Sequence, residues 1–539
     1  MSFNLAALHE AIAARIPERE CLVFGERRFA WRDTHERTRR LGALLRSRGL
    51  GCHRERSELA PWESGQDHVA LYLYNGNEYL EGMLGAFKAR TVPVNVNYRY
   101  VEEELVYLLR DCGARALIYH ARFAPTLARI RDHIAEPALW LQVADDSGEA
   151  LLPGALDFEV ALAASEPAAP EGLSPDDLYC LYTGGTTGMP KGVLWRQEDV
   201  FHGALYTKPV SSVEEVVARA ERGQIRAMPA PPFMHGAAHW LAFNMWFLGG
   251  TVVVQPKPER LDPKLLWETV ARERVTALTI VGDAFARPLI EELRAAEHDV
   301  TSLRLLTSGG AILSASLKRE LLELIPGLRI VDTLGSSESG RQAEHSSRDG
   351  RAETGRFALD AQSVVLREDL SGAVEAGSGE TGWLARAGRV PLGYLGDPEK
   401  TRRTFPEIDG VRYAVPGDRA QLEADGALRL LGRDSVTINT GGEKVYAEEV
   451  EHALKHHPAV WDTVVVGTPH ERWGQQVTAL VKLREGQAPG EQALLEVARE
   501  HVAAYKLPKR FVFVDEILRS PSGKADYRWA KQRAAKSGG

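Results

Sequence analysis

Helical and strand patterns alternate along this chain, and the alternation limits the folds that it can adopt. An apolar strand pattern at residues 68–74 (HVALYLY) is followed by a helix pattern at 78–90 and by further strand patterns at 92–96 and 114–120. Parallel strands need crossover connections, which are usually helices, so this order predicts mostly parallel sheets covered by helices. The expected fold class is therefore α/β.

The pattern changes twice towards the C-terminus. From residue 355 to about 425, short strand patterns alternate with glycine-rich turns, which predicts a β-rich subdomain. After residues 432–435 (GRDS), helix patterns at 447–456 and 491–504 are interleaved with strand patterns. We expect a large N-terminal lobe with mixed and parallel sheets, followed by a small α+β C-terminal domain. A polar stretch at 52–67 is typical of a surface loop.

Composition excludes several classes of protein. The 539 residues carry 66 Lys and Arg against 74 Asp and Glu, and this net charge of −8 argues against nucleic acid as the main partner. Cys21, Cys52, Cys112 and Cys180 are widely spaced and predict free thiols rather than a disulfide framework or a zinc site. The N-terminus lacks a signal-peptide pattern, and the most apolar stretch, 240–254, is shorter than the ~20 residues of a spanning helix. We therefore expect a cytoplasmic protein without a transmembrane segment.

The strongest local motif is LYTGGTTGMPKGV at residues 181–193, where an apolar strand (178–182) runs into a loop rich in glycine and threonine. Glycines let backbone N–H groups approach a polyphosphate, hydroxyl groups add donors, and Lys191 adds positive charge. The motif is not a Walker A loop, because Gly192 stands where that motif requires Ser or Thr. The pattern indicates a phosphate-binding loop, with a flexible hydroxyl-rich turn as the alternative.

Six motifs occur in the order typical of the adenylate-forming enzymes, the superfamily of acyl-CoA synthetases, amino-acid adenylation domains and luciferases. They are YTGGTTGMPKGV (182–193), PPFMHG (231–236), LGSSES (334–339), YAVPGD (413–418), GRDSVTINTGGEKVYAEEVE (432–451) and SPSGKADY (520–527). Because the six matches are in order along most of the chain, the resemblance is far more specific than any one motif. GSSES, YAVPGD and INTGGEKVYAEEVE together resemble bacterial acyl-CoA synthetases for fatty acids and for sterol or bile-acid side chains.

The resemblance implies a domain layout and an ATP site. Residues 1–431 would bind AMP and the acyl group, 432–435 would form a hinge at Ser435, and 436–539 would form a mobile C-terminal domain. The residues implied to bind ATP or AMP are Thr183, Gly184, Gly185, Thr186, Thr187, Gly188, Lys191, Gly309, Gly310, Asp332, Thr333, Leu334, Gly335, Ser336, Ser337, Asp418, Arg433 and Lys524. Lys524, Lys191 and Glu338 would be catalytic, and Glu338 would also hold Mg²⁺, which prefers oxygen ligands.

Each polar residue also has an ordinary structural explanation. Asp418 would accept hydrogen bonds from the ribose hydroxyls, although aspartate after glycine is also common in tight turns. Arg433 would contact ribose or phosphate, or else form a surface salt bridge. Glu338 would be a solvated side chain if it held no metal. Lys524 would stabilise charge that develops between the carboxylate and the α-phosphate, although a lysine in a Pro-Ser-Gly turn is most often solvated.

The same resemblance implies an acyl pocket and a path for CoA. The implied acyl-binding residues are His235, Gly236, Trp240, Asp283, Ser308 and Gly309, with His235 as a gate and ordinary core packing as the alternative. The implied CoA-binding residues are Gly441, Gly442 and Lys444, since glycines permit close backbone contact with pantetheine. Three positions depart from the family pattern: Leu334 replaces an aromatic residue expected to stack on adenine, Pro416 replaces a threonine, and Ser435 replaces Asp or Lys. The departures weaken any transfer of detailed adenine contacts.

The leading hypothesis is a ligase that depends on ATP and Mg²⁺. It would first form an acyl-adenylate and pyrophosphate and would then transfer the acyl group to CoA. The expected substrate is a medium- or long-chain fatty acid or a steroid side chain. A homodimer is one possible assembly. The alternatives are an adenylate ligase that loads a carrier protein, a luciferase-like oxygenase, and a non-catalytic nucleotide sensor. No carrier domain follows Lys524 in this sequence. A sensor would predict loss of Lys524, Glu338 or the glycine-threonine loop, and all three are present.

Overall fold

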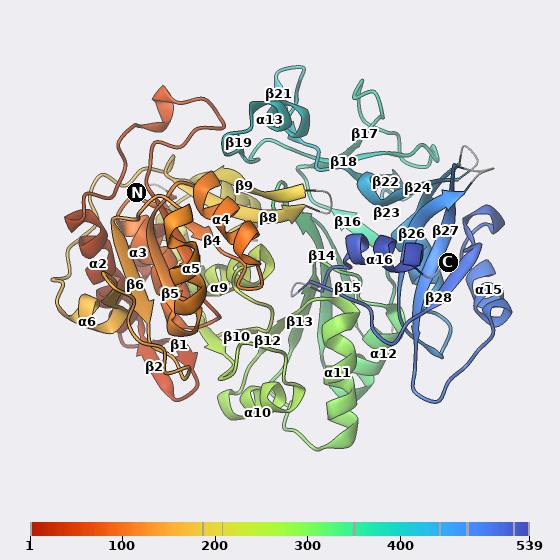
Figure 1. Cartoon of the computed structure of the whole chain (residues 1–539), viewed down its shortest axis with the longest axis horizontal. Coiled ribbons are helices and arrows are strands. Elements are labelled where there is room, and N and C mark those ends of the chain that lie inside the picture. The colour runs from red at the N-terminus through yellow and green to blue at the C-terminus, as the bar shows by residue number, and fades with distance from the viewer. Residues whose placement is uncertain are drawn as a thin grey trace.

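The computed structural model describes residues 3–185, 188–206, 208–348, 352–440, 443–470, 474–520 and 523–536. Figure 1 shows a large lobe, coloured from red to teal, and a small C-terminal domain in blue on one side of it. No helix in these ranges has both the length and the apolar character needed to cross a membrane. The predicted architecture of a large α/β lobe with a small C-terminal domain is confirmed.

The N-terminal part of the large lobe is built on a parallel five-stranded sheet in the order β4–β3–β5–β6–β7. Its strands are β3 (His68–Tyr72), β4 (Val92–Asn95), β5 (Ala114–His120), β6 (Leu139–Val143) and β7 (Leu156–Asp157). The helices of this region are α2 (Trp31–Ser47), α3 (Asn77–Lys88), α4 (Glu102–Asp111), α5 (Ala124–Ile130) and α6 (Phe158–Ala163). Every residue of β3, β4 and β6 is buried, as expected for a parallel sheet covered on both faces.

A 15-stranded sheet forms the centre of the large lobe. Its parallel strands are β1 (Glu20–Phe24), β10 (Arg226–Pro229), β11 (Thr251–Val254), β12 (Ala277–Ile280), β13 (Leu305–Gly309) and β14 (Arg329–Ser336), and β2 (Arg27–Ala30) pairs with β1 at one edge. Its helices are α1 (Leu5–Arg15), α7 (Gln197–Val200), α8 (Val213–Ala220), α9 (Gly236–Phe247), α10 (Pro263–Glu273), α11 (Gly282–Ala295) and α12 (Ala315–Leu324). In such sheets, ligands bind beyond the carboxyl ends of the strands, which directs attention to the ends of β12, β13 and β14.

The same sheet continues as the predicted β-rich subdomain. Beyond β14 it becomes antiparallel, starting with the pairing of β14 and β15. The strands of this part are β15 (Gly340–Ser347), β16 (Arg356–Leu359), β17 (Ser363–Leu366), β18 (Gly382–Ala387), β20 (Glu407–Ile408), β21 (Val411–Ala414), β22 (Asp418–Leu422) and β23 (Leu428–Arg433). Helix α13 (Pro398–Thr404) packs beside them at the top of Figure 1.

A separate three-stranded sheet carries the glycine- and threonine-rich loop. β8 (Leu178–Gly185) and β9 (Gly188–Arg196) form an antiparallel hairpin, and β19 (Gly393–Tyr394) pairs with β9. The sequence predicts a strand that ends at Tyr182, whereas the strand continues to Gly185. It is longer because β9 supplies an antiparallel partner, with Thr183 opposite Lys191.

The small domain contains a five-stranded sheet with antiparallel pairs and one parallel pair, β27 with β28. Its strands are β24 (Thr437–Thr440), β25 (Glu443–Tyr446), β26 (Val460–His470), β27 (Gly474–Leu483) and β28 (Arg510–Phe513), and its helices are α14 (Ala447–Leu454), α15 (Glu491–Arg499) and α16 (Tyr527–Lys536). The helices predicted at 447–456 and 491–504 are present but end earlier. Pro458 disfavours helical backbone just before it, which accounts for an end near Leu454.

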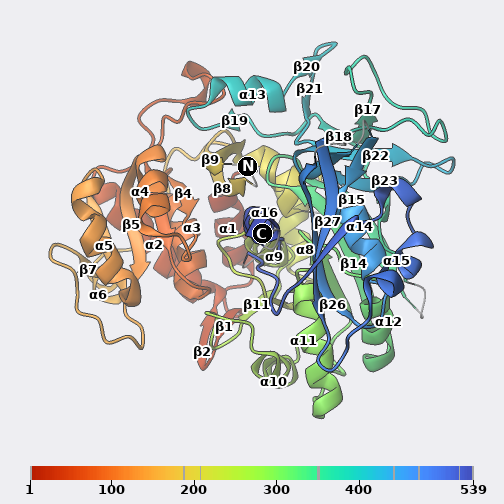
Figure 2. The same ribbon diagram turned by 45° about the vertical axis from the view of Figure 1, so that its right-hand side comes forward.

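The chain passes between the two domains through a short connection. β23 ends at Arg433 in the large lobe, and a 3₁₀ helix, Asp434–Val436, leads into β24 of the small sheet. Figure 2 shows the small domain in front of the large lobe. Each domain has its own apolar core, which includes fully buried Trp246 in the large lobe and Val465 in the small one.

Candidate active site

The glycine- and threonine-rich hairpin is held in place at its base. Asn95, at the end of β4, donates to the Tyr182 carbonyl (2.9 Å) and accepts from its N–H (2.7 Å). Gly192 faces the Tyr182 ring, where an added Cβ would lie 2.7 Å from a ring carbon. Of the predicted phosphate-binding residues, Thr183, Gly184, Gly185 and Gly188 lie in this hairpin, and Thr186 and Thr187 lie outside the described residues.

Lys191 stands on β9 beside a carboxylate from another part of the chain. Its ammonium lies 3.6 Å from Oδ2 of Asp397. Desolvation alone would lower the pKa of Lys191, but Tyr107, Asp111 and Asp397 outweigh it and raise this pKa above the usual value. Lys191 therefore keeps the positive charge that a phosphate-binding role requires.

Glu338 lies in the tight turn between β14 and β15. The Tyr394 hydroxyl donates to Oε1 of Glu338 at 3.0 Å. Trp195 Nε1 on β9 donates to the Ser337 carbonyl at 2.9 Å, which ties the phosphate hairpin to this turn. Gly335 permits the close approach of the two strands, since an added Cβ would lie 2.1 Å from a carbonyl oxygen of the facing strand.

The donor set at Glu338 fits a Mg²⁺ ion. Mg²⁺ usually keeps several waters and binds through one or two carboxylates together with substrate phosphates. Glu338 supplies one such carboxylate, and one of its oxygens is already oriented by Tyr394. Within the described ranges, the only group of three or more potential ligand side chains is His9, Glu10 and His35, which line neither of the cavities described below. A magnesium ion here would therefore be held by Glu338 and by ATP.

Asp418 and Arg433 face each other across β22 and β23. Arg433 Nε donates to Oδ1 of Asp418 at 3.1 Å, and Asp418 is 9% exposed. The charge of Asp418 raises the pKa of Arg433, which keeps the guanidinium charged. The pair places an acceptor for hydroxyl groups beside a donor for phosphate oxygens.

Lys524 reaches the large lobe from the small domain. The preceding Gly523 has a φ angle of +72°, and an added Cβ would lie 2.8 Å from Cγ1 of Val281, just beyond β12. Desolvation and then the nearby Arg433 lower the pKa of Lys524, although neighbouring carboxylates, Glu338 foremost, oppose this change. The charges of Glu338 and Arg433 therefore both act on the ammonium group of Lys524.

Two cavities meet at Lys524. The first, of about 630 Å³, lies between the domains and is lined by residues that include Gly310, Asp332, Thr333, Leu334, Asp418, Arg433 and Lys524. The second, of about 720 Å³, is lined by residues that include Thr183, His235, Gly236, Trp240, Leu241, Met245, Ser308, Gly309, Ser336, Ser337 and Lys524. The predicted nucleotide residues are divided between the two cavities: Asp332, Asp418 and Arg433 line only the first, and Thr183, Gly309, Ser336 and Ser337 line only the second. Gly310, Thr333, Leu334, Gly335 and Lys524 line both, and most of the predicted acyl residues line the second.

Comparison with known proteins agrees with this arrangement. The profile of the AMP-binding enzyme family matches residues 9–394, and the profile of the AMP-binding enzyme C-terminal domain matches residues 449–524. The chain belongs to the AMP-binding enzyme family. The resemblance inferred from the six motifs is confirmed.

Relatives of this AMP-binding enzyme match along almost the whole chain. The medium-chain acyl-CoA ligase Mig of Mycobacterium avium is 51% identical and covers 99% of this chain and 98% of the relative. The 3-oxocholest-4-en-26-oate–CoA ligase of Rhodococcus rhodochrous is 40% identical, with 99% and 96% covered. Among solved structures, the anthranilate CoA ligase AuaEII in complex with anthranoyl-AMP has a TM-score of 0.81 at 24% identity, with 99% and 98% covered. This structure supports the fold.

A chain of hydrogen bonds holds Trp240 on the wall of the second cavity. Trp240 Nε1 donates to the Tyr179 hydroxyl at 2.7 Å, and that hydroxyl is bonded to Nε2 of His239. Nδ1 of His239 is bonded to the Phe233 carbonyl at 2.6 Å. Burial lowers the pKa of His239 to about 4, so its ring is neutral, donates through Nδ1 and accepts through Nε2. Trp240 is therefore a fixed part of the cavity wall.

His235 lies where α9 begins and lines the same cavity. Desolvation, followed by the charge of Lys524, lowers the pKa of His235 to about 3, so the ring is neutral near pH 7. Its Nε2 has no hydrogen-bond partner among the described residues. The neighbouring Gly236 is needed for space, since an added Cβ would lie 2.9 Å from Cδ2 of Leu181. The gating role of His235 stays a prediction.

Asp283 lies in a different place from the predicted acyl site. Its Oδ1 accepts from the Ser314 N–H at 2.7 Å, and its Oδ2 lies 3.5 Å from Nζ of Lys455 in the small domain. Among the described residues it lines the first cavity and not the second. The acyl-binding role predicted for Asp283 has no support in this geometry, because its carboxylate is used at the interface between the domains.

The predicted hinge and CoA-binding residues are described only in part. Gly441 and Gly442 lie outside the described residues. The backbone of Lys444 pairs with Asn439 across β24 and β25. Ser435 lies in the 3₁₀ helix between the two sheets. The roles of these four residues stay predictions.

Three residues of the site were not predicted from the sequence. The Tyr394 hydroxyl donates to Glu338, and the Asp397 carboxylate lies beside Lys191, as described above. Asp397 followed by a proline is a typical start of a helix, but this local signal does not reveal what the helix contacts. Glu448 also lines the first cavity, and desolvation, together with Glu451 and then Asp418, raises its pKa to about 7.

The lowered pKa of Lys524 predicts a pH dependence for this AMP-binding enzyme. Only the protonated lysine carries positive charge, so kcat/KM for ATP should fall as the pH rises through the lowered pKa, below the ~10.4 of an ordinary lysine. In Lys524→Arg, the guanidinium stays charged, and the fall should move to higher pH while the maximum decreases. Pyrophosphate exchange measured from neutral to alkaline pH tests this. If kcat/KM for ATP falls at the same alkaline pH in the wild type and in Lys524→Arg, a group other than Lys524 titrates.

Proposed function

We propose that this AMP-binding enzyme is an ATP-dependent acyl-CoA ligase that activates an apolar carboxylic acid as acyl-AMP and transfers the acyl group to CoA. The observation that carries the proposal is the position of Lys524, which lines both the cavity that contains Asp418 and Arg433 and the cavity that contains His235 and Trp240. Relatives at 51% and 40% identity are named acyl-CoA ligases, which supports this activity over the loading of a carrier protein.

In the first step, the carboxylate of the acid attacks the α-phosphate of ATP, and pyrophosphate leaves. The Asp418 carboxylate binds the ribose hydroxyls, and the hairpin with Lys191 binds the β- and γ-phosphates. Lys524 stabilises the negative charge that develops between the attacking carboxylate and the α-phosphate, because catalysis of phosphoryl transfer depends mainly on positioning and on charge stabilisation. Mg²⁺, bound by Glu338 and ATP, would supply further neutralisation of the phosphate charge.

In the second step, the sulfur of CoA attacks the acyl carbonyl, and AMP leaves. We assign residues 1–431 and 436–539 to two domains with a hinge at 432–435, because the chain changes sheets between Arg433 and Thr437. Rotation at this hinge would withdraw Lys524 and bring the predicted CoA-binding segment to the acyl-AMP. The ion pair between Asp283 and Lys455 joins the two domains in the present arrangement and would have to open.

The second cavity favours an apolar acid. Its volume of about 720 Å³ is within the range of small-molecule sites, and Trp240, Leu241 and Met245 contribute to its wall. We propose a medium- or long-chain fatty acid or a steroid side chain as the substrate. We also propose a cytoplasmic location, where ATP and CoA are available and where reducing conditions suit the four free cysteines.

A panel of carboxylic acids tests the proposed function. Short- to long-chain, aryl and steroid acids are each incubated with ATP, Mg²⁺ and CoA, and the products are identified by mass. We expect AMP, pyrophosphate and a CoA thioester from at least one apolar acid. Accumulation of acyl-AMP with no use of CoA for any acid would favour carrier loading, and absence of pyrophosphate release would reject adenylation.

Filling the second cavity should shorten the acids that are accepted. Leu241 on α9 lines this cavity, and Leu241→Trp adds an aromatic ring there. Because one methylene group in an apolar pocket changes discrimination about 10- to 200-fold, kcat/KM for the longest accepted acid should fall at least tenfold. Activity with short acids and the KM for ATP should change little. An equal loss for acids of every length would show that Leu241 does not limit the depth of the pocket.

A further inference from the structure

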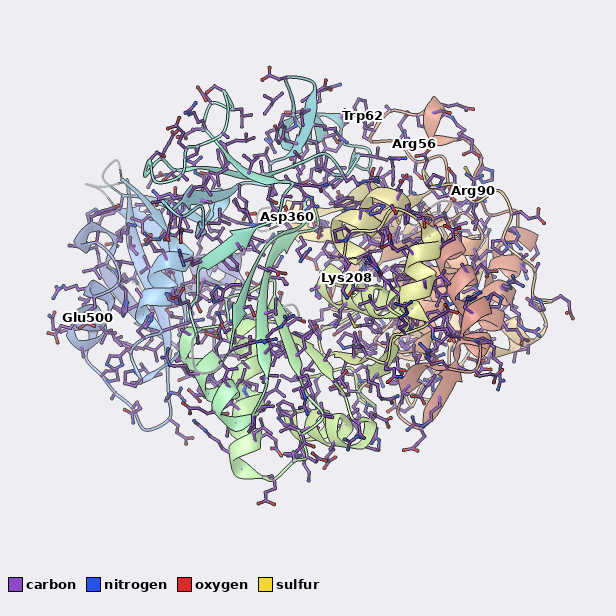
Figure 3. The ribbon with its side chains drawn as sticks, turned by 180° about the vertical axis from the view of Figure 1, so that it is seen from behind. Arg56, Trp62, Arg90, Lys208, Asp360 and Glu500 are labelled. Carbon is purple, nitrogen blue, oxygen red and sulfur yellow. The ribbon has the colours of Figure 1, made fainter. Side chains whose placement is uncertain are left out.

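The polar loop at residues 52–67, which we call the brace, joins two parts of the large lobe. It leaves the N-terminal region after α2 and reaches the segment 393–402, which contains β19 and the start of α13. Figure 3 shows Arg56 and Trp62 on the part of the brace that approaches this segment, and Arg90 nearer its base. The brace thus connects segments more than 300 residues apart in sequence.

We infer that the brace positions the phosphate end of the active site: it holds residues 393–402, whose Tyr394 and Asp397 in turn hold Glu338 and Lys191. This inference rests on the proposed adenylation of an acid. Trp62, Tyr394 and Asp397 are positioning residues, since they act through the side chains that would meet ATP.

The base of the brace is fixed to the strand that leads into the phosphate hairpin. Arg90 donates to both carboxylate oxygens of Glu55 at 2.9 Å and to Oδ1 of Asp177 at 2.8 Å. Gln66 accepts from the N–H of Leu178, the first residue of β8, at 2.7 Å, and donates to the Arg90 carbonyl at 2.8 Å. The Asp177 side chain is 1% exposed, so this ion pair with Arg90 is shielded from solvent on one side. The base is therefore a rigid anchor.

The tip of the brace has its own internal support. Arg56 donates to the Glu63 carbonyl at 2.7 Å and also to the Ala60 carbonyl. The Glu63 carboxylate accepts from the Ala60 N–H at 2.8 Å. These bonds close a compact turn around Trp62, which contacts the segment beyond it.

Trp62 makes two contacts with the segment 393–402. Its carbonyl accepts from the Gly396 N–H at 2.9 Å. The Arg402 guanidinium on α13 lies 5.2 Å from the centre of the indole ring, within the range of a cation–π contact. Gly396 has a φ angle of +66°, which few other residues adopt readily, so the turn depends on both its glycine and its partner.

The segment held by Trp62 carries the partners of Lys191, a predicted ATP-binding residue, and of Glu338, the predicted Mg²⁺ ligand. Tyr394 is 2% exposed and pairs with Val193 of β9, while its hydroxyl donates to Glu338. Asp397 caps α13 by accepting from the Lys400 N–H at 3.0 Å, and its other oxygen faces Lys191 at 3.6 Å. A shift of this turn would therefore move both partners together. Misplacement by about 1 Å at a reacting centre can cost ~10²-fold in rate, so such support has functional consequences.

Trp62→Ala removes the ring beneath Arg402 and tests the inference in the full-length protein. From the strength of a single cation–π contact, we expect KM for ATP to rise roughly three- to tenfold, with KM for the acid unchanged within about twofold. Trp62→Phe, which keeps an aromatic face, should restore most of the wild-type value. Equilibrium binding of ATP without acid, measured by calorimetry, should weaken by the same factor in Trp62→Ala.

Arg402→Gln removes the same contact from the other side and provides an independent variant if Trp62→Ala does not fold. Its effect should match that of Trp62→Ala. The double substitution should raise KM for ATP little more than either single one, because both remove the same interaction.

Tyr394→Phe should weaken ATP binding about tenfold or more, since it deletes a hydrogen bond to a charged group. Tyr119→Phe, which deletes a bond from a buried hydroxyl to Gln142 in another sheet, is the matched control and should leave ATP binding unchanged.

The outcomes separate this inference from the proposed function. If the wild-type protein forms no acyl-adenylate with any acid, the proposed function fails. If the wild-type protein is active but Trp62→Ala and Arg402→Gln bind ATP normally, the inference is wrong. It is also wrong if both variants have a lower melting temperature and lose affinity for ATP and for the acid equally, because the brace is then only a structural loop.

Discussion

Replacing Lys524 with alanine is expected to lower the rate of acyl-adenylate formation about 10²–10³-fold, the cost of removing one preorganised charge-stabilising group. The reason is geometric, since Lys524 of the small domain lines both cavities and lies near Glu338 and Arg433. Thioester formation from supplied acyl-AMP should survive much better, because the proposed rotation withdraws this lysine before CoA attacks. The two half-reactions are measured separately, by pyrophosphate exchange and by release of the thioester.

Lys531→Ala provides the matched control for this experiment. Lys531 lies on α16 of the same domain, is exposed, and lines neither cavity. Its removal should leave both half-reactions near the wild-type rate. Equal losses in both half-reactions of Lys524→Ala, with an unchanged melting temperature, would contradict the proposed withdrawal of the lysine. Losses in proportion to a lower melting temperature would instead indicate a structural role.

Replacing Asp418 with alanine is expected to weaken ATP and AMP binding roughly 10–10²-fold, the usual range for losing a hydrogen bond to a charged group. Asp418 lines the first cavity, is 9% exposed, and accepts from Arg433. Its removal also leaves the Arg433 guanidinium without its carboxylate partner, which adds to the loss. Asp418→Asn keeps the shape and one acceptor, so its loss should be smaller. AMP binding is measured by calorimetry and by the rise in melting temperature that AMP produces.

Asp369→Ala serves as the control for the change of charge. Asp369 lies in an exposed turn of the same β-rich subdomain, where it accepts from the Ser371 N–H at 2.9 Å, and it lines neither cavity. AMP should bind this variant as it binds the wild type. If Asp418→Ala binds AMP normally while its fold is intact, Asp418 does not hold the ribose and the nucleotide must lie elsewhere.

Local patterns were sufficient for much of the fold. The apolar run at 68–74 predicted a buried strand, and β3 is buried at every residue because a strand in the middle of a covered parallel sheet has no solvent-facing side. The helices at 447–456 and 491–504 were predicted from their periodicity, and only their ends were wrong. The extension of β8 to Gly185 was not predicted, since it depends on pairing with β9 rather than on the apolar character of its own residues.

The sequence by itself determined the family, and its motifs predict a role for each group: glycines and a lysine for phosphate, Glu338 for a metal, Asp418 for hydroxyls and Lys524 for developing charge. Only the tertiary structure decided which of these groups meet and which residues hold them. It directed Asp283 to Lys455 at the domain interface, Tyr394 to Glu338, and the polar loop at 52–67 to Gly396. Contacts of this kind join residues far apart in the chain, and they follow from sheet register and domain packing. No local pattern of residues carries that information, because the free energy of each contact depends on where the rest of the chain places its partner.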